Sequence, residues 1–217
     1  MRNHSKSSSA FLRQASRLCS SRRFCTGYAM LSAAKVCSSL PLYPTGNPDC
    51  CLNLCRGLVD LLSQILPLKP AATLSVGSGT GMLEALLVAH NPQLRIDGVE
   101  VSTKVNKYIL EQNMHTVAGT WELCPVAKEA EAWLFVYPKE VELVKKYILG
   151  YGNNDITGAI IWLGPRSDWQ EYEPLLEEFG TVELYTGRHV VSLYEIMAVS
   201  RRPGNDTREE RLSFDDI

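Results

Sequence analysis

The feature that most constrains the fold is a run of alternating glycines, Gly77, Gly79 and Gly81. The apolar stretch before it, Leu74–Val76, is typical of the end of a buried strand. Residues 82–90 have helical apolar spacing and precede an Asn-Pro stop. A strand, a glycine turn and a helix form the first half of a nucleotide-binding βαβ unit, because glycines let the backbone approach a ligand and the helix N-terminus offers unpaired N–H groups. The sequence therefore predicts a binding site at this turn.

The spacing of the glycines separates two kinds of ligand. A dinucleotide fingerprint has its last glycine at the sixth position of the motif, which Met82 occupies here, so dinucleotide oxidoreduction is disfavoured. The run Arg95–Glu100 predicts a second strand that ends in a carboxylate, the group that binds ribose hydroxyls in Rossmann folds. The G-x-G-x-G pattern with this spaced acid resembles motif I of the class I S-adenosylmethionine-dependent methyltransferases.

The resemblance extends over residues 40–200 and implies a fold, a cofactor and a reaction. We expect an α/β fold with a three-layer, Rossmann-like sheet that is mostly parallel and has a closing antiparallel strand. The resemblance implies S-adenosyl-L-methionine as the cofactor and a small-molecule acceptor, methylated by in-line transfer. In its small size the chain is similar to compact methyltransferase-like proteins of fungi, some of which lie in secondary-metabolite clusters. The cofactor-binding residues that the resemblance implies are Gly77, Ser78, Gly79, Gly81, Glu100, Val101, Thr120 and Trp121.

Several of the implied site residues have alternative interpretations. Thr120 occupies the place of an acid that often binds the adenine amino group in the family, and Trp121 either lies on the adenine face or packs in the core. Tyr43, in a loop, either covers the methionine end of the cofactor or only packs. Tyr137 and Pro138 follow the expected fourth strand, whose end faces the transferred methyl group in the family, and they are the substrate-side candidates.

The catalytic residues are not defined by the sequence. Methyl transfer from a sulfonium requires positioning and the exclusion of water, and a general base is optional. His115 and His189 are the candidate bases, although a loop histidine can simply be solvated. Ser75 stands where family members carry an acid that holds the cofactor's ammonium group, and serine supplies no charge. A second function therefore stays open, that of a non-catalytic protein of this fold acting as a partner subunit, with a different protein or a second copy of the chain as its partner.

Charge and cysteine content disfavour other classes of function. The 217-residue chain has a formal net charge of −2, and its first 48 residues contain seven basic residues and no acid, so the remainder is acidic. An acidic body disfavours a nucleic-acid substrate, and no apolar run is long enough for a transmembrane helix. The seven cysteines are odd in number, and Cys50, Cys51 and Cys55 lack a second pair at metal-ligand spacing. We expect free thiols and no metal site.

The composition divides the chain into three parts. Residues 1–37 are a basic segment. It is a mitochondrial targeting peptide, a disordered tail, or the result of a start assigned upstream of the true one at Met30. Residues 38–200 are the Rossmann-like methyltransferase domain, and residues 201–217 are a polar tail. Location is therefore predicted as mitochondrial, with the cytoplasm as the alternative.

The remaining pattern predicts the elements of that domain. They are a helix up to residue 65 capped by Asp49, a helix over 104–113, strands near 116–121, 132–137 and 158–165, helices over 139–149 and 168–179, and closing strands over 181–185 and 190–199.

Overall fold

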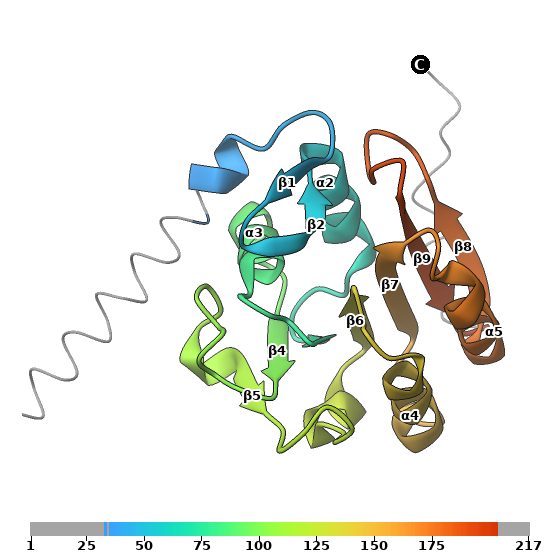
Figure 1. Cartoon of the computed structure of the whole chain (residues 1–217). Coiled ribbons are helices and arrows are strands. Elements are labelled where there is room, and N and C mark those ends of the chain that lie inside the picture. Colours follow the sequence, from blue (N-terminus) through green and yellow to red (C-terminus); the bar gives the residue numbers. More distant parts are fainter. Residues whose placement is uncertain (1–32, 34, 204–217) are drawn as a thin grey trace, which may run out of the picture.

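A single seven-stranded sheet forms the centre of the protein in the computed structural model, which describes residues 33 and 35–203. Its strands are β3 (Thr73–Val76), β4 (Ile96–Glu100), β5 (Met114–Thr116), β6 (Ala132–Val136), β7 (Ala159–Pro165), β8 (Thr181–Tyr185) and β9 (Glu195–Arg201). They lie in the order β5-β4-β3-β6-β7-β9-β8 (Figure 1). The first five strands in this order pair in parallel, whereas β9 is antiparallel to both β7 and β8. The expected mostly parallel sheet with a closing antiparallel strand is confirmed.

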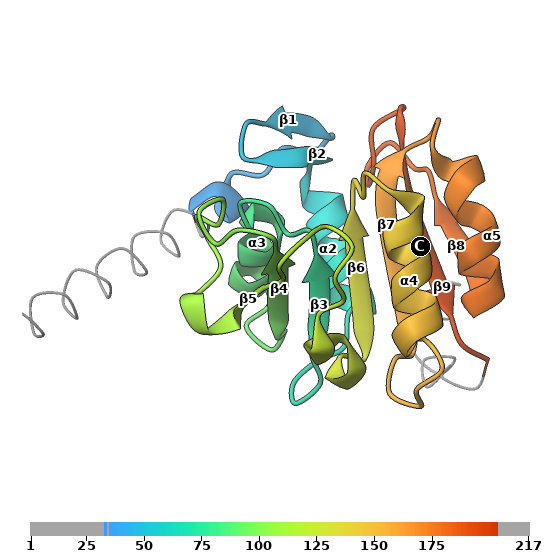
Figure 2. The ribbon, with the colours of Figure 1, turned by 60° about the horizontal axis from the view of Figure 1, so that its bottom comes forward.

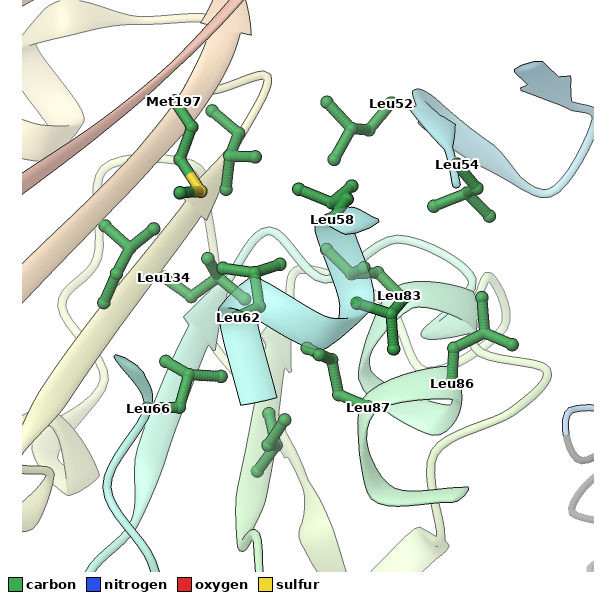
Figure 3. Close-up of a cluster of buried hydrophobic side chains, with 14 of the residues drawn as sticks. Leu52, Leu54, Leu58, Leu62, Leu66, Leu83, Leu86, Leu87, Leu134 and Met197 are labelled. Atoms are coloured by element: carbon green, nitrogen blue, oxygen red, sulfur yellow. The ribbon is translucent and has the colours of Figure 1, made fainter. Parts of the chain in front are cut away.

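Helices pack on both faces of this sheet. They are α2 (Arg56–Ile65), α3 (Met82–His90), α4 (Val141–Tyr151) and α5 (Trp169–Phe179). Successive residues of a strand point to opposite faces, so Leu134 of β6 packs in the core under α2 and α3, while its neighbour Phe135 packs under α4 and α5. Leucines of α2 and α3 meet Leu134 and Met197 in the first of these cores (Figure 3). The expected three-layer arrangement is therefore confirmed.

The prediction of a helix beginning after Asp49 is wrong at its N-terminal end. Residues before α2 form a hairpin of β1 (Thr45–Asn47) and β2 (Cys50–Leu54) beyond one end of the sheet (Figure 2). Leu52 and Leu54 are buried and the intervening Asn53 is half-buried, so the segment has the period of a strand. Asp49 caps no helix. Its carboxylate accepts hydrogen bonds from Lys107 and Tyr108 instead.

The prediction of a helix over residues 104–113 is also wrong. Only a short 3-10 helix, η1 (Glu111–Asn113), forms there. The Asn106 side chain accepts from the backbone N–H groups of Tyr108 and Ile109 at 3.2 and 3.0 Å, and its amide donates to the carbonyl of Ile109 at 2.9 Å. These local bonds compete with helical ones. A hollow of about 700 Å³ lies between this segment and α3.

The other predicted elements match observed helices and strands to within a few residues, with two exceptions. The strand expected near 116–121 overlaps β5 only at Thr116, and the last strand begins at Glu195 rather than at residue 190. Most of the predicted targeting segment and polar tail, residues 1–32, 34 and 204–217, lies outside the described residues. The three-part division of the chain stays a prediction. In the described part of the chain, no helix is long and apolar enough to cross a membrane.

Candidate active site

A crevice lies at the carboxyl ends of β3, β4 and β6, where ligands of open α/β sheets bind. It consists of two adjoining cavities that share Cys51, Gly77, Gly79 and Val136. The β4 cavity, of about 360 Å³, is lined also by Glu100, Val101, Thr120, Tyr137 and Pro138. The hairpin cavity, of about 230 Å³, is lined also by Asp49, Cys50, Ser78, Met82 and Glu84.

The glycine turn between β3 and α3 forms the floor of both cavities. Gly77, Gly79 and Gly81 have φ of 75, 58 and 79°, a region that residues with a side chain rarely adopt. A Cβ added at Gly77 or Gly79 meets no atom within 4 Å, so their backbone faces open space. Gly81 lines neither cavity. A Cβ there would lie 2.4 Å from Cγ1 of Ile109, so close packing adds to the positive φ as a reason for glycine at this position.

Glu100 links the end of β4 to this turn. Its Oε1 accepts from the N–H of Gly79 at 2.7 Å, and its Oε2 accepts from the N–H of Val101 at 3.2 Å. Each carboxylate oxygen has about two acceptor sites, so one on each oxygen remains for a ligand. The two halves of the sequence signature therefore meet in one structural unit.

Four more of the predicted residues line the β4 cavity: Val101, Thr120, Tyr137 and Pro138. Trp121 is not among the residues that line either cavity. It is 47% exposed, and the ammonium group of Lys146 lies 5.1 Å from its ring centroid. The structure thus places Trp121 neither on the cavity wall nor in the core.

Tyr137 has an unusual backbone conformation at the end of β6. It has a φ of 50°, in the left-handed region. Its hydroxyl donates to Oε1 of Glu195 at 2.8 Å, and that oxygen also accepts from the backbone and side-chain N–H groups of Asn53. Burial and the bond to Glu195 raise the pKa of the Tyr137 phenol. The phenol is therefore a neutral hydrogen-bonding group rather than a base.

The structure brings neither Tyr43 nor the two candidate histidines to the walls of the crevice. Tyr43 packs on the ring of His189, with 5.2 Å between the ring centroids. His115 lies on the edge strand β5, and its Nε2 is buried without a hydrogen-bond partner. Cys37, Cys50, Cys51, Cys55 and Cys124 are free thiols, and no three potential metal ligands cluster within the described ranges.

Sequence reasoning missed a buried carboxyl group beside the turn. Glu84, in the first turn of α3, is 3% exposed, and its Oε1 accepts from the Ser75 hydroxyl at 2.5 Å. Burial raises the pKa of Glu84 to about 7, against the effect of the Ser75 bond. From the sequence alone, Glu84 is expected on the solvated face of the helix. The one hint of its burial is that an acid stands among apolar residues. Glu195, fully buried on β9, carried no signal at all.

No protein-family model matches the chain, and no curated protein matches it. Solved structures do match. A precorrin-6y C5,15-methyltransferase from Geobacter metallireducens GS-15 is 11% identical, with a TM-score of 0.53 over 74% of this chain and 93% of that chain. The methyltransferase domain of bacterial CtHen1 is 13% identical, with a TM-score of 0.48 over 66% of this chain and 94% of that chain. PhzM, a pyocyanin biosynthetic protein, is 13% identical, with a TM-score of 0.48 over 67% of this chain and 54% of that chain.

The strand order and the first of these likenesses define the class of fold. The chain has the fold of the class I S-adenosylmethionine-dependent methyltransferases. At such low identities the comparison shows the fold and does not assign the activity.

Proposed function

We propose that the protein binds S-adenosylmethionine in the crevice and methylates a small molecule. The proposal rests on one observation: the backbone N–H of Gly79 donates a hydrogen bond to the Glu100 carboxylate, and both residues line the β4 cavity. The geometry fits the cofactor, because two glycines leave open space above the turn and the carboxylate keeps free acceptor sites for two ribose hydroxyls. When bound, the cofactor supplies an electrophilic methyl group on a sulfonium.

Each part of the site has a role in this proposal. Glu100 accepts from the ribose hydroxyls, and Gly77 and Gly79 admit the ligand close to the backbone. Val101 and Thr120 border the adenosine, and Tyr137 and Pro138 lie on the side of the acceptor. Catalysis then consists of positioning the acceptor and excluding water.

The charge of the crevice supports a small acceptor over a nucleic acid. The β4 cavity is lined by three glutamates, Glu100, Glu122 and Glu140, and by one lysine, Lys139. A polyanion would be repelled by this wall, because phosphate binding needs clustered cations.

The second function, that of a partner subunit without activity, is favoured by one observation. Of the described residues that line the crevice, none is a histidine, and the Tyr137 hydroxyl already donates a hydrogen bond to Glu195. A protein of this kind would bind the cofactor or its product without turnover. Its partner, a different protein or a second copy of the chain, would be found by cross-linking.

The proposal is tested by calorimetry with S-adenosylhomocysteine and NAD on the wild type and on Glu100→Gln. A glutamine places an N–H₂ group against the N–H of either Gly79 or Val101 and removes the charge. We expect the variant to lose about 2–3 kcal/mol, near a hundredfold in affinity for S-adenosylhomocysteine.

Glu178→Gln, at an exposed position on α5, is the matched control and should bind as the wild type does. Circular dichroism verifies that each variant is folded. Binding of NAD without binding of S-adenosylhomocysteine would overturn the proposal. Equal affinity of Glu100→Gln and the wild type would show that Glu100 does not hold the ribose.

A further inference from the structure

Glu84, a residue that lines the hairpin cavity, has a buried carboxyl oxygen without a hydrogen-bond partner in the described part of the chain. Oε1 of Glu84 accepts from Ser75, but Oε2 has no hydrogen-bond partner among the described residues. A buried carboxyl oxygen without a partner costs stability, so such an atom suggests a missing ligand group. Glu84 lines the cavity together with the turn residues Gly77, Ser78 and Gly79.

Among the described residues, no cation bonds to the Glu84 carboxyl. The Lys107 ammonium near the hairpin cavity pairs with Asp49 at 2.5 Å. The neighbouring charged group that acts on Glu84 is Glu100, which has the same sign. Cys50 of β2 faces the same cavity, and burial raises the pKa of its thiol to about 12, so the thiol is neutral. Glu84 also borders the hollow beside α3, where Lys69 and Arg95 lie. Lys69 donates to the carbonyl of Pro92 at 2.7 Å, and Arg95 pairs with Asp97 at 3.0 Å.

The cavity suits a compact cation with N–H donors. An ammonium group has three donors and no acceptor, and a buried carboxylate is stabilised by such a partner. The same glycine turn borders the β4 cavity, so one ligand can reach both Glu100 and Glu84.

We propose that Glu84, held by the Ser75 hydroxyl, binds the α-ammonium group of the cofactor's amino-acid end. The inference rests on the proposed function, because the adenosine in the β4 cavity brings the ammonium into the hairpin cavity. In the family, the acid that holds the ammonium stands on the strand, at the position that Ser75 occupies here. In this chain Glu84 of helix α3 takes over that role, and the Ser75 hydroxyl orients its carboxyl group.

Binding should release a proton. In the free protein the Glu84 carboxyl has a pKa of about 7, and an ammonium beside it lowers that pKa because it favours the charged form. The Glu84 carboxyl releases its proton to the buffer, and the ammonium group of the ligand keeps its three protons. At pH 6 the release should be about nine-tenths of a proton, and affinity should fall about eightfold between pH 7.5 and pH 6.

The experiment compares two ligands that differ in one group. S-Adenosylhomocysteine has the ammonium, whereas its deamino analogue keeps the adenosine, thioether and carboxylate but lacks it. Titration of Glu84→Gln should show a loss of about 10- to 100-fold for S-adenosylhomocysteine and no loss for the deamino analogue. Glu178→Gln is again the control. Titration of the wild type in two buffers of different ionisation enthalpy measures the proton released, and this readout needs no variant.

The outcomes separate the two proposals. If the wild type binds neither ligand, the proposed function fails and the role of Glu84 fails with it. If the wild type binds both with no proton release, or if Glu84→Gln loses the two ligands equally, the cofactor site stands and the role of Glu84 is overturned. If Glu84→Gln does not fold, the proton release and the pH dependence of the wild type decide.

Discussion

At the scale of single residues, the Ser75–Glu84 pair lies in the core at the cost of stability. Both side chains are buried, at 1% and 3% exposure, and their bond spans 2.5 Å. A carboxyl buried among apolar groups prefers its protonated form, because burial penalises the charge. The charged form of Glu84, which is the form that would bind a cation, therefore lowers the stability of the ligand-free protein.

This cost should be visible in the pH dependence of stability. Burial raises the pKa of Glu84 from 4.5 to about 7 in the folded state, so the folded protein holds the proton that the unfolded chain has lost. Stability therefore falls as pH rises from 4.5 to 7. Glu84→Gln removes the titration, and relative to the wild type it should gain about 3 kcal/mol between pH 4.5 and pH 8.

Urea denaturation of both proteins at the two pH values measures this gain. Glu178→Gln should show no such gain, since its side chain is exposed. A difference between Glu84→Gln and the wild type that is the same at both pH values would contradict the assignment of the titration to Glu84.

At the scale of elements, the β1–β2 hairpin is tied to the segment that replaces the expected helix. Asp49, in the hairpin turn, accepts from the Lys107 ammonium at 2.5 Å and from the Tyr108 hydroxyl at 2.6 Å, while its carbonyl accepts from Thr80 of the glycine turn. The bonds from Lys107 and Tyr108 hold the pKa of Asp49 below its usual range. One residue thus joins three segments around the hairpin cavity.

Breaking this link should loosen the hairpin without unfolding the sheet. Asp49→Asn removes the charge that pairs with Lys107, and a partly exposed pair is worth about 1 kcal/mol or less. We expect faster hydrogen exchange in residues 45–54, with unchanged exchange in β6 and β7. Asp155→Asn, in an exposed loop, is the control. Unchanged exchange in the hairpin would show that Asp49 does not hold it.

At the scale of the whole molecule, charge is unevenly distributed along the chain. The seven basic residues among the first 48 precede a domain in which three of the four charged residues that line the β4 cavity are acidic. This contrast agrees with two separate roles, in which the N-terminal segment directs location and the domain binds a ligand. We propose a mitochondrial location on the sequence alone, from an acid-free segment in which Arg13 and Arg17 oppose an apolar face.

The location is tested by fusing residues 1–30 to a fluorescent protein. The fusion should enter mitochondria, whereas replacement of Arg13 and Arg17 by glutamate in the same fusion should abolish import by removing the basic face. A diffuse cytosolic signal from the unaltered fusion would contradict the proposal and favour translation from Met30.

Much of the fold could be predicted because its signals are local. The spacing of apolar residues, together with the turn residues Gly, Pro and Asn, predicted the positions of most strands and helices, including β8 at Thr181–Tyr185. The two wrong helix predictions have different causes. In residues 50–54 the buried side chains alternate as in a strand, and β2 pairs with β1. In residues 104–113 the Asn106 side chain bonds to nearby backbone groups, and these local bonds compete with helical ones. Trp121 and Tyr43 lie off the walls of the crevice, and the sequence left their roles open because the direction of a loop side chain has no periodic pattern.

The sequence by itself determined the parallel sheet, the glycine turn and the acid at the end of β4, because each depends on residues close together in the chain. Only the tertiary structure decided which buried carboxyl groups lie at or behind the walls of the crevice. Glu84 lies nine residues after Ser75, and Glu195 lies 58 residues after Tyr137, yet each pair is joined by a hydrogen bond. The physical reason is that the desolvation that shifts the pKa of a carboxyl depends on what packs around it. That packing is set by elements that are distant in the sequence, and no local pattern records it.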